Sequence, residues 1–388
     1  MAIGIVGAGP AGLLIALCLL DAGVRSQIHL FEGAEDIGGR TRMSTYEGVR
    51  VVAGAGVVRD RDVLMKRLAK RFHVPLSRFI THIQRPPRAI DIIKTMRRLR
   101  PMVDRGQTFS ENLVRILGED AYHRFVESSG STDYQDADVV DTIDDYGFQD
   151  NTSGQVMFGI DWDRLMQCML RACRSHRNFH LHLSTPITSV KRIRGGGGFS
   201  LNHDEWIVRD LFWTAPRPSW KLLPIHSKKW RSIMRGVACQ SFLRAYSKPT
   251  DPVVAQQTFP CTTYMPFGNP VQKIIPYRDG VYMVAYCDNA SADAVHKHPE
   301  NLDRWTGIRW HTPVVFYHPC GTHFFRPLDT TLWKDRDAFL EYARHPSPHL
   351  YICGEGLSRN QGWTEGAIGS VLSVLKPFAG QTLEDLFI

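Results

Sequence analysis

Long hydrophobic runs are missing from this sequence of 388 residues. A helix that crosses a bilayer needs about 20 consecutive apolar residues, and the most apolar stretch, residues 13–20, is much shorter. A basic leader with a cleavage site is also missing, because an apolar strand is predicted directly after Met1. The composition, 43% hydrophobic and 22% charged, is that of a globular protein. We therefore expect a cytoplasmic protein with no membrane-spanning segment.

Closely spaced cysteines are missing as well. The eight cysteines include no C-x-x-C pair, and none stands with histidines at the spacing of a zinc site. We therefore expect no bound metal. We interpret most of the cysteines as small buried hydrophobic residues in a protein of a reducing compartment.

An excess of acidic residues is likewise absent, and the formal net charge is +8. Many basic residues fall in two helix-like stretches, residues 59–71 and 92–105. Because neither stretch has interleaved aromatic residues on which bases could stack, we interpret them as solvated helix faces rather than as a nucleic-acid-binding surface. The positive charge favours an anionic or zwitterionic substrate over a polycation. Neither the charge nor the composition indicates an oligomeric state.

The first 32 residues do carry a strong pattern, which is strand, glycine-rich turn, apolar helix and second strand. The turn reads G-x-G-x-x-G at Gly7, Gly9 and Gly12, and Glu32 closes the second strand twenty positions later. This combination is the dinucleotide-binding fingerprint of a Rossmann-like βαβ unit. The alternative is a tight turn of the same shape that binds nothing.

Each part of the fingerprint has a physical role. Gly7 allows the tight turn, Gly9 lets the backbone approach a pyrophosphate, and Gly12 lets the helix pack against the strand. The helix that begins at Pro10 and Ala11 offers free N–H groups to the phosphates. Glu32 is expected to accept hydrogen bonds from ribose hydroxyls.

The segment after Glu32 carries Gly38-Gly39-Arg40. Together with the fingerprint it resembles the flavin amine oxidoreductase family, which includes monoamine, polyamine and L-amino-acid oxidases, with phytoene desaturases and protoporphyrinogen oxidases as more distant relatives. The resemblance implies an α/β fold in two parts. A Rossmann-like FAD-binding domain would comprise residues 1–60, 154–235 and 347–388. An inserted α+β substrate domain with a mixed or antiparallel sheet would comprise residues 61–153 and 237–346.

The C-terminal segment carries the most specific part of the resemblance. Residues 351–355 read Y-I-C-G-E and residues 361–367 read Q-G-W-T-E-G-A, similar to the family's G-[DE] and G-[YW]-x-E-G-A pair. The resemblance implies that Glu355 binds the ribityl chain and that Trp363 forms one wall of the substrate site, although a core aromatic residue is the alternative for Trp363. Further cofactor contacts are implied for Gly38, Gly39, Arg40, Gly54, Ala55, Ile187, Ala215, Gly354, Thr364 and Ala367.

Several residues that many family members keep are missing here. Thr322 stands where Cys-linked members attach FAD, so non-covalent FAD is implied. Residues 236–246 include no lysine, whereas many members use one there to reach flavin N5 through water. Gln240 or Arg244 would occupy part of that space. His323 takes the place of the second aromatic wall and is a candidate proton acceptor, with a structural histidine as the alternative.

The function implied is that of a flavoprotein oxidoreductase of the amine oxidase type. A small amine or amino acid between Trp363 and His323 would transfer a hydride to flavin N5, with O₂ as one candidate electron acceptor. Arg244 or Arg326, with Arg59 as a weaker candidate, would bind the carboxylate of an amino acid, unless these are ordinary structural arginines. Tyr286 would line the site. Two alternatives remain: a desaturase-type dehydrogenase, and an FAD-binding protein with little turnover.

Overall fold

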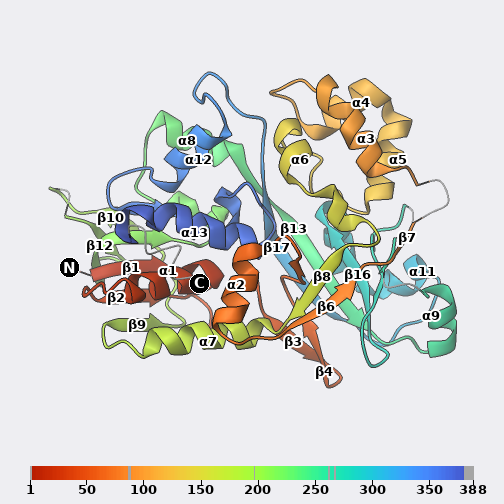
Figure 1. The fold of residues 1–388 in the computed structure, drawn as a ribbon, viewed down its shortest axis with the longest axis horizontal. Coiled ribbons are helices and arrows are strands. Elements are labelled where there is room, and N and C mark those ends of the chain that lie inside the picture. Colours follow the sequence, from red (N-terminus) through yellow and green to blue (C-terminus); the bar gives the residue numbers. More distant parts are fainter. Residues whose placement is uncertain (1, 86–88, 196, 261–262, 266–267, 380–388) are drawn as a thin grey trace.

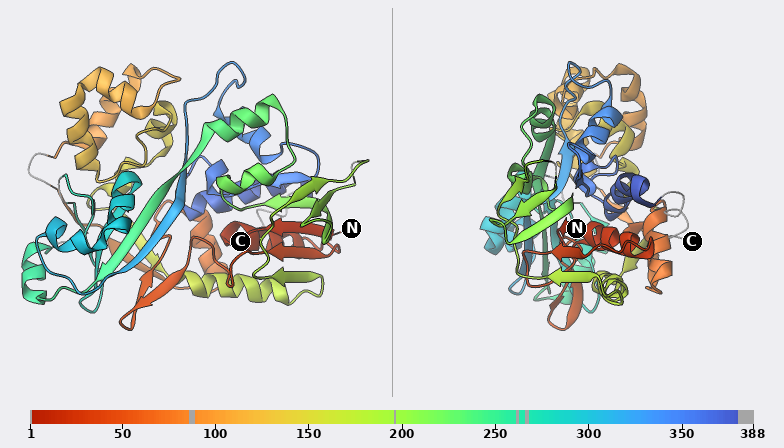
Figure 2. Two further views of the ribbon diagram at one scale, coloured as in Figure 1. Left: turned by 180° about the vertical axis from the view of Figure 1, so that it is seen from behind. Right: turned by 90° about the vertical axis from the view of Figure 1, so that its left-hand side faces the viewer.

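A computed structural model describes residues 2–85, 89–195, 197–260, 263–265 and 268–379 of the protein. Figure 1 shows two sheets with their own helices, one at each end of the long axis of the molecule. The chain passes between the two parts several times, as the mixed colours of each part show in Figures 1 and 2.

The larger sheet has seven strands and a parallel centre, in which β1 pairs with β2 and β12, β2 with β9, and β12 with β18. Its strands come from three distant parts of the chain and lie within the ranges predicted for the FAD domain, whose residues 380–388 are outside the described part. The strands are β1 (Ala2–Val6), β2 (Ile28–Phe31), β9 (Phe179–His182), β10 (Val190–Arg192), β11 (Phe199–Leu201), β12 (Trp206–Trp213) and β18 (Leu350–Ile352).

Helix α1 (Pro10–Asp21) is buried over almost its whole surface, because it lies between the sheet and the helices α7 (Trp162–Arg174) and α13 (Thr364–Ala379). This position explains why the helix is apolar all round. Helix α2 (Val63–Arg71) packs on α13 and contributes its apolar face to the same core. Although α2 lies after the predicted boundary at residue 61, it packs in the same apolar core as α1.

The second sheet is antiparallel, with strand order β15 (Ile275–Pro276), β16 (Tyr282–Asp288), β13 (Val237–Ser247) and β17 (Val314–Phe325). Four helices form a lobe beyond one end of this sheet, with a separate apolar core (Figure 1). They are α3 (Ile92–Leu99), α4 (Phe109–Leu117), α5 (Glu119–Ser129) and α6 (Val139–Asp145).

Short strands and helices complete the fold. The small sheets are β3 (Met43–Tyr46) with β4 (Val49–Val52), β5 (Val58–Arg59) with β8 (Val156–Ile160) and β6 (Leu76–Ile80), and β7 (Ile83–Gln84) with β14 (Thr263–Tyr264). The other helices are α8 (Lys228–Gly236), α9 (Pro252–Thr258), α10 (Asn289–Lys297), α11 (Leu302–Thr306) and α12 (Arg336–Arg344), with 3₁₀ turns at Arg100–Met102, Phe148–Asn151, Arg217–Leu222, Pro299–Asn301 and Glu355–Leu357. Within the described residues no helix is both long and apolar enough to span a membrane.

Candidate active site

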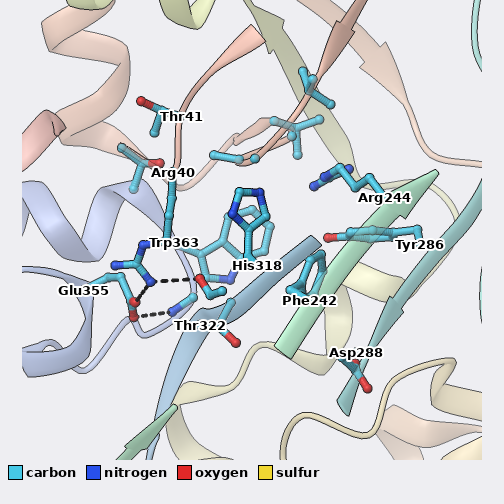
Figure 3. A pocket seen from close by; sticks show the side chains of 18 of the residues that line it. Arg40, Thr41, Phe242, Arg244, Tyr286, Asp288, His318, Thr322, Glu355 and Trp363 are labelled. Atoms are coloured by element: carbon cyan, nitrogen blue, oxygen red, sulfur yellow. Dashed lines mark hydrogen bonds and ion pairs between the residues drawn. The ribbon is translucent and has the colours of Figure 1, made fainter. Parts of the chain in front are cut away.

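A cavity of about 1020 Å³ lies where the two halves of the molecule meet. Its walls combine the turn before α1, the segment before α13 and the strands β13, β16 and β17. This volume is at the upper end of the roughly 300–1,000 Å³ that is usual for ligand clefts. Figure 3 shows side chains from both halves pointing into this space.

The glycine-rich turn forms one end of the cavity, where Gly7, Gly9, Pro10 and Ala11 line the wall. Gly7 has a φ of +103°, and a Cβ placed on Gly12 would lie 1.8 Å from the Gly7 carbonyl oxygen. The turn therefore requires glycine at both positions. No side chain caps the N-terminus of α1, so its first backbone N–H groups are left for a ligand.

Glu32 lines the same end of the cavity. Its carboxylate accepts the backbone N–H of Ala8 at 2.8 Å and that of Ala34 at 3.0 Å. These two bonds fix the carboxylate beside the turn, and each oxygen keeps a lone pair with which it can accept a ligand hydroxyl.

Glu355 is the centre of a buried polar cluster at the cavity wall. Its Oε1 accepts from Arg40 Nη1 at 2.6 Å and from His323 Nδ1 at 2.5 Å, and its Oε2 accepts the Gly362 N–H at 3.1 Å. Arg40 also donates to the Gly321 carbonyl at 2.8 Å (Figure 3). Burial opposes ionisation of Glu355, but its interactions with His323 and Arg40 outweigh it and hold its pKa well below the usual value. Glu355 is thus a fixed anion that links the segments containing Arg40, His323 and Gly362.

Trp363 lines the cavity immediately before α13. The guanidinium of Arg59 lies 3.8 Å from the centroid of the Trp363 ring, a cation–π contact that fixes the ring. Arg59 in turn pairs with Asp62 at 2.7 Å and Asp150 at 3.2 Å. Of the other predicted cofactor contacts, the cavity wall includes Gly39, Arg40, Gly54, Ala55, Ala215, Gly354, Thr364 and Ala367.

The opposite wall is aromatic and cationic. Phe242, Tyr286 and His318 line it, and the Phe242 and Tyr286 rings meet edge to face at 4.9 Å. The guanidinium of Arg244 lies 4.2 Å above the Tyr286 ring. His318 Nε2 is 2.7 Å from the Ala53 carbonyl oxygen, and burial lowers the pKa of this histidine.

Arg244 is a buried cation without an acidic partner. It is 6% exposed, and within the described residues no carboxylate forms an ion pair with it. Its Nη1 is 3.5 Å from the Met283 sulfur, and its Nε has no hydrogen-bond partner. A Cβ on Gly56 would lie 2.9 Å from Nη2, so the glycine leaves the space that the guanidinium fills.

Two carboxylates and a lysine line the far end of the cavity. Burial, and then the neighbouring Asp288, raise the pKa of Asp133 to about 7, and burial also raises the pKa of Asp288. Tyr146 donates its hydroxyl to Asp133. Lys273 Nζ donates to Ser131 Oγ at 2.9 Å, and burial lowers the pKa of this lysine. This end of the cavity thus holds a carboxyl group, that of Asp133, which can exchange a proton near neutral pH.

Comparison with known proteins defines the fold. Residues 5–72 match the family described as NAD(P)-binding Rossmann-like domain, and no curated protein matches the sequence. A putrescine oxidase solved with putrescine has 13% identity over 97% of this chain and 99% of that chain, with a TM-score of 0.71. The cyclohexylamine oxidase of Brevibacterium oxydans IH-35A has 12% identity over 99% of both chains and a TM-score of 0.76.

This chain has the amine-oxidase fold. A protein of Exiguobacterium sp. 255-15 to which protoporphyrinogen oxidase activity is attributed shares it too, with 12% identity over 97% of this chain and 98% of that chain and a TM-score of 0.68. The predicted α/β architecture with a Rossmann-like domain is therefore confirmed.

Within this amine-oxidase fold, two predicted catalytic residues lie behind the cavity wall. His323 and Gln240 are buried and face a separate small cavity, and Gln240 Nε2 donates to the Asp133 carbonyl at 2.9 Å and to Thr322 Oγ1 at 3.1 Å. His323 therefore does not form the aromatic wall that was predicted. Thr322 lines the cavity, and alternation along β17 places its neighbour His323 on the opposite face. Between Gln240 and Phe242 the pairing contains a bulge, in which β13 advances by two residues while β17 advances by four, from Thr322 back to His318.

Two further predictions are wrong in position. Arg326 is exposed and does not line the cavity, because the chain leaves the sheet directly after β17. Ile187 packs in the core beside the larger sheet instead of facing the cavity. Gly12 and Gly38 also lie outside the lining, but they shape the turn, since the Gly38 N–H donates to the Ala8 carbonyl at 2.9 Å.

The cysteines differ from the prediction at one place. Cys18, Cys173, Cys287 and Cys353 are buried and unpaired as expected, whereas Cys239 and Cys320 form a disulfide. With His323 their ligand atoms lie within 4.8 Å of one another, so the fold brings together a Cys–Cys–His group that sequence spacing did not show. Cys261 lies outside the described residues.

Sequence reasoning missed His318, Asp133 and Lys273. The alternation of residues along β17 was an available signal for His318, which lies on the same side of the strand as Phe316. For Asp133 and Lys273 no local signal existed, because each lies in an irregular segment that only the fold brings to the cavity.

Proposed function

We propose that this protein is an FAD-dependent oxidoreductase that oxidises a small amine, and specifically one that carries a carboxylate, such as an amino acid. Arg244 is the observation that carries the proposal. Leaving a buried guanidinium unpaired is costly, and a substrate carboxylate in the cavity would supply the missing anion through charge-assisted hydrogen bonds.

The residues present fit FAD. The uncapped N-terminus of α1 offers N–H groups for the pyrophosphate, and Glu32 is fixed where a ribose would lie. Thr322 stands where the resemblance places the linking cysteine, and the sulfur of the nearby Cys320 is bonded to Cys239. Both observations support non-covalent attachment. Bound FAD would supply the oxidant, accepting a hydride at N5 and leaving the amine as an imine.

The chain's own residues would bind and orient the substrate. Arg244 holds the carboxylate, while Trp363 and the Phe242–Tyr286 pair provide apolar walls that exclude water. An amine binds as an ammonium ion and must lose a proton before it can be oxidised. Asp133, with a pKa of about 7, is the cavity group best matched to take that proton. The substrates named for the structural relatives, putrescine and cyclohexylamine, support an amine as the reacting group.

The test is anaerobic reduction of the FAD-loaded protein. A panel of amino acids and of the amines obtained by removing their carboxylates is added, and the yellow flavin band is followed by stopped flow. We expect an amino acid to bleach the band faster than its matched amine. Admitting air afterwards shows whether O₂ restores the band. A yellow protein that no amine or amino acid reduces would refute the proposal and favour a binding protein with little turnover.

A further inference from the structure

The bulge in β17 creates a second chemical group at the cavity wall. It brings Cys320 to a Cα–Cα distance of 5.2 Å from Cys239 on β13, within the range that disulfides require. Gly321 has no room for a side chain, because a Cβ there would lie 2.4 Å from the Phe242 Cβ. The conformation that joins the two sulfurs is therefore specified by the sequence, and such bulges often re-aim side chains near active sites.

A proton acceptor stands beside the disulfide. His323 Nε2 is 3.5 Å from the Cys320 sulfur and also accepts the Arg217 backbone N–H at 3.2 Å. Because Nε2 accepts this bond, the ring proton is on Nδ1, which faces Glu355 Oε1. The ionised Glu355 would stabilise a positive charge on the ring. To take a proton from Cys320, Nε2 must release the Arg217 N–H, because the neutral ring has a single acceptor nitrogen, and the ionised Glu355 then stabilises the charged ring.

The two sulfurs also differ in access from the four buried cysteines, although the free Cys168 is partly exposed as well. Cys239 and Cys320 are partly exposed, and Cys320 lines the large cavity. In contrast, burial raises the pKa of Cys18, Cys173 and Cys353 to about 12, so these thiols are inert at neutral pH. Cys239 and Cys320, the one disulfide among the described residues, thus lie beside the buried pair His323 and Glu355.

We propose that Cys239 and Cys320 form a redox-active disulfide, which exchanges two electrons with a dithiol and uses His323 as the proton acceptor for Cys320. A thiolate of the dithiol attacks the Cys239 sulfur, the S–S bond breaks, and its electron pair leaves on Cys320. The second thiol of the reductant then displaces Cys239 and closes its own disulfide. The dithiol is oxidised, the protein disulfide is reduced, and the two protons of the dithiol end on Cys239 and on His323 beside the Cys320 thiolate.

The alternative occupant of this cluster is a zinc ion, since two cysteines, a histidine and a carboxylate behind the histidine resemble a zinc site. The bond between the sulfurs argues against it, because a disulfide has no thiolate to offer a metal. The proposal stands independently of amine oxidation, although Cys320 borders the same large cavity.

The test is thiol mapping on the folded, full-length protein. Protein is incubated with dithiothreitol, labelled with iodoacetamide, and each cysteine is followed by mass spectrometry. We expect Cys239 and Cys320 to be unlabelled before reduction, to become labelled under native conditions, and to be protected again by oxidised dithiothreitol. The pH profile of Cys320 labelling should have a midpoint at least one unit below the roughly 8.5 of a free thiol. Cys18, Cys173 and Cys353 should stay unlabelled and serve as internal controls.

His323→Gln is the matched variant. It should keep the disulfide but slow Cys320 labelling at neutral pH by about tenfold and return its pH midpoint toward that of a free thiol. The proposal is overturned if the pair resists dithiothreitol until denaturant is added, if both thiols are free in air, or if one equivalent of zinc protects them. An unshifted pH profile in the wild-type protein overturns it as well, whether or not the variant folds.

Discussion

Two buried arginines, Arg59 against Trp363 and Arg244 in the cavity wall, differ in whether a carboxylate pairs with them. Arg59 is 1% exposed and pairs with Asp62 and Asp150, which neutralise it in place. Arg244 is similarly buried but lacks any such carboxylate within the described residues. Because a buried charge is retained only if something compensates it, the first arginine has a structural role and the second is available to a ligand.

The first prediction concerns Arg244→Met. Loss of a charge-assisted contact to the substrate carboxylate should lower the rate of flavin reduction by an amino acid, at limiting substrate, by about thirtyfold, or roughly 2 kcal/mol. The matched amine without a carboxylate should be affected little. Stopped-flow reduction measures both. Arg326→Met is the control, because Arg326 is exposed and away from the cavity. Equal losses for amine and amino acid would contradict the assignment.

Asp133 gives a prediction about pH. Its pKa rises from about 3.9 in an unfolded chain to about 7 in the fold. Because the folded protein holds this proton more tightly, the contribution of Asp133 to stability is complete below about pH 4 and is lost as the pH rises through about 7. Asp133→Asn should therefore match the wild type at about pH 4.5 and become the more stable protein at about pH 8, as measured by urea unfolding. A constant difference across this range would refute the shift.

At the scale of elements, α2 and α13 depend on each other through one carboxylate. The N-cap residue of α2, Asp62, makes no capping bond within its helix, since its carboxylate holds Arg59. Glu365 of α13 supplies the cap instead, accepting the backbone N–H of Leu64 at 3.0 Å and of Met65 at 2.8 Å. The segment that carries Trp363 is thereby fixed to the nucleotide-binding half.

Glu365→Ala should accordingly reduce the free energy of unfolding by about 0.5–2 kcal/mol, the usual range for loss of a helix cap. Glu365→Gln keeps one acceptor oxygen, so its free energy of unfolding should fall by less than that of Glu365→Ala. Denaturant titration of the FAD-free proteins measures both. If Glu365→Ala were as stable as the wild type, the cross-helix cap would have no energetic role.

His323 shows where prediction from sequence failed. His318 and Thr322 both line the cavity, because the two extra residues between them leave the alternation of faces along the strand unchanged. His323 follows Thr322 and so lies on the opposite face, whereas Phe242, Tyr286 and His318 form the wall that it was expected to form. No local signal marks the bulge, since it depends on pairing with a strand about eighty residues away.

At the scale of the whole molecule, the Rossmann-like unit and the joining of the two chain ends were predictable. Glycine spacing and the C-terminal G-W-T-E-G-A segment each impose a local geometry that does not depend on the rest of the chain. Arg40, Glu355 and Trp363, which these segments predicted as site residues, line the cavity. Arg326 and Ile187 were not placed correctly, because their neighbours are set by long-range packing. The neighbours of Asp133 and Lys273 are also set by long-range packing.

The central claim is that the turn before α1 holds the diphosphate of FAD, and Gly9→Val tests it most directly. Gly9 lines the cavity, so a branched side chain there should block the approach of the pyrophosphate. Gly197→Val, at an exposed site outside the cavity lining, is the control. After incubation with FAD and desalting, the flavin-to-protein ratio is read from the absorption spectrum. We predict stoichiometric FAD in the wild type and in Gly197→Val and none in Gly9→Val, whereas a fully flavinated Gly9→Val protein would contradict the account.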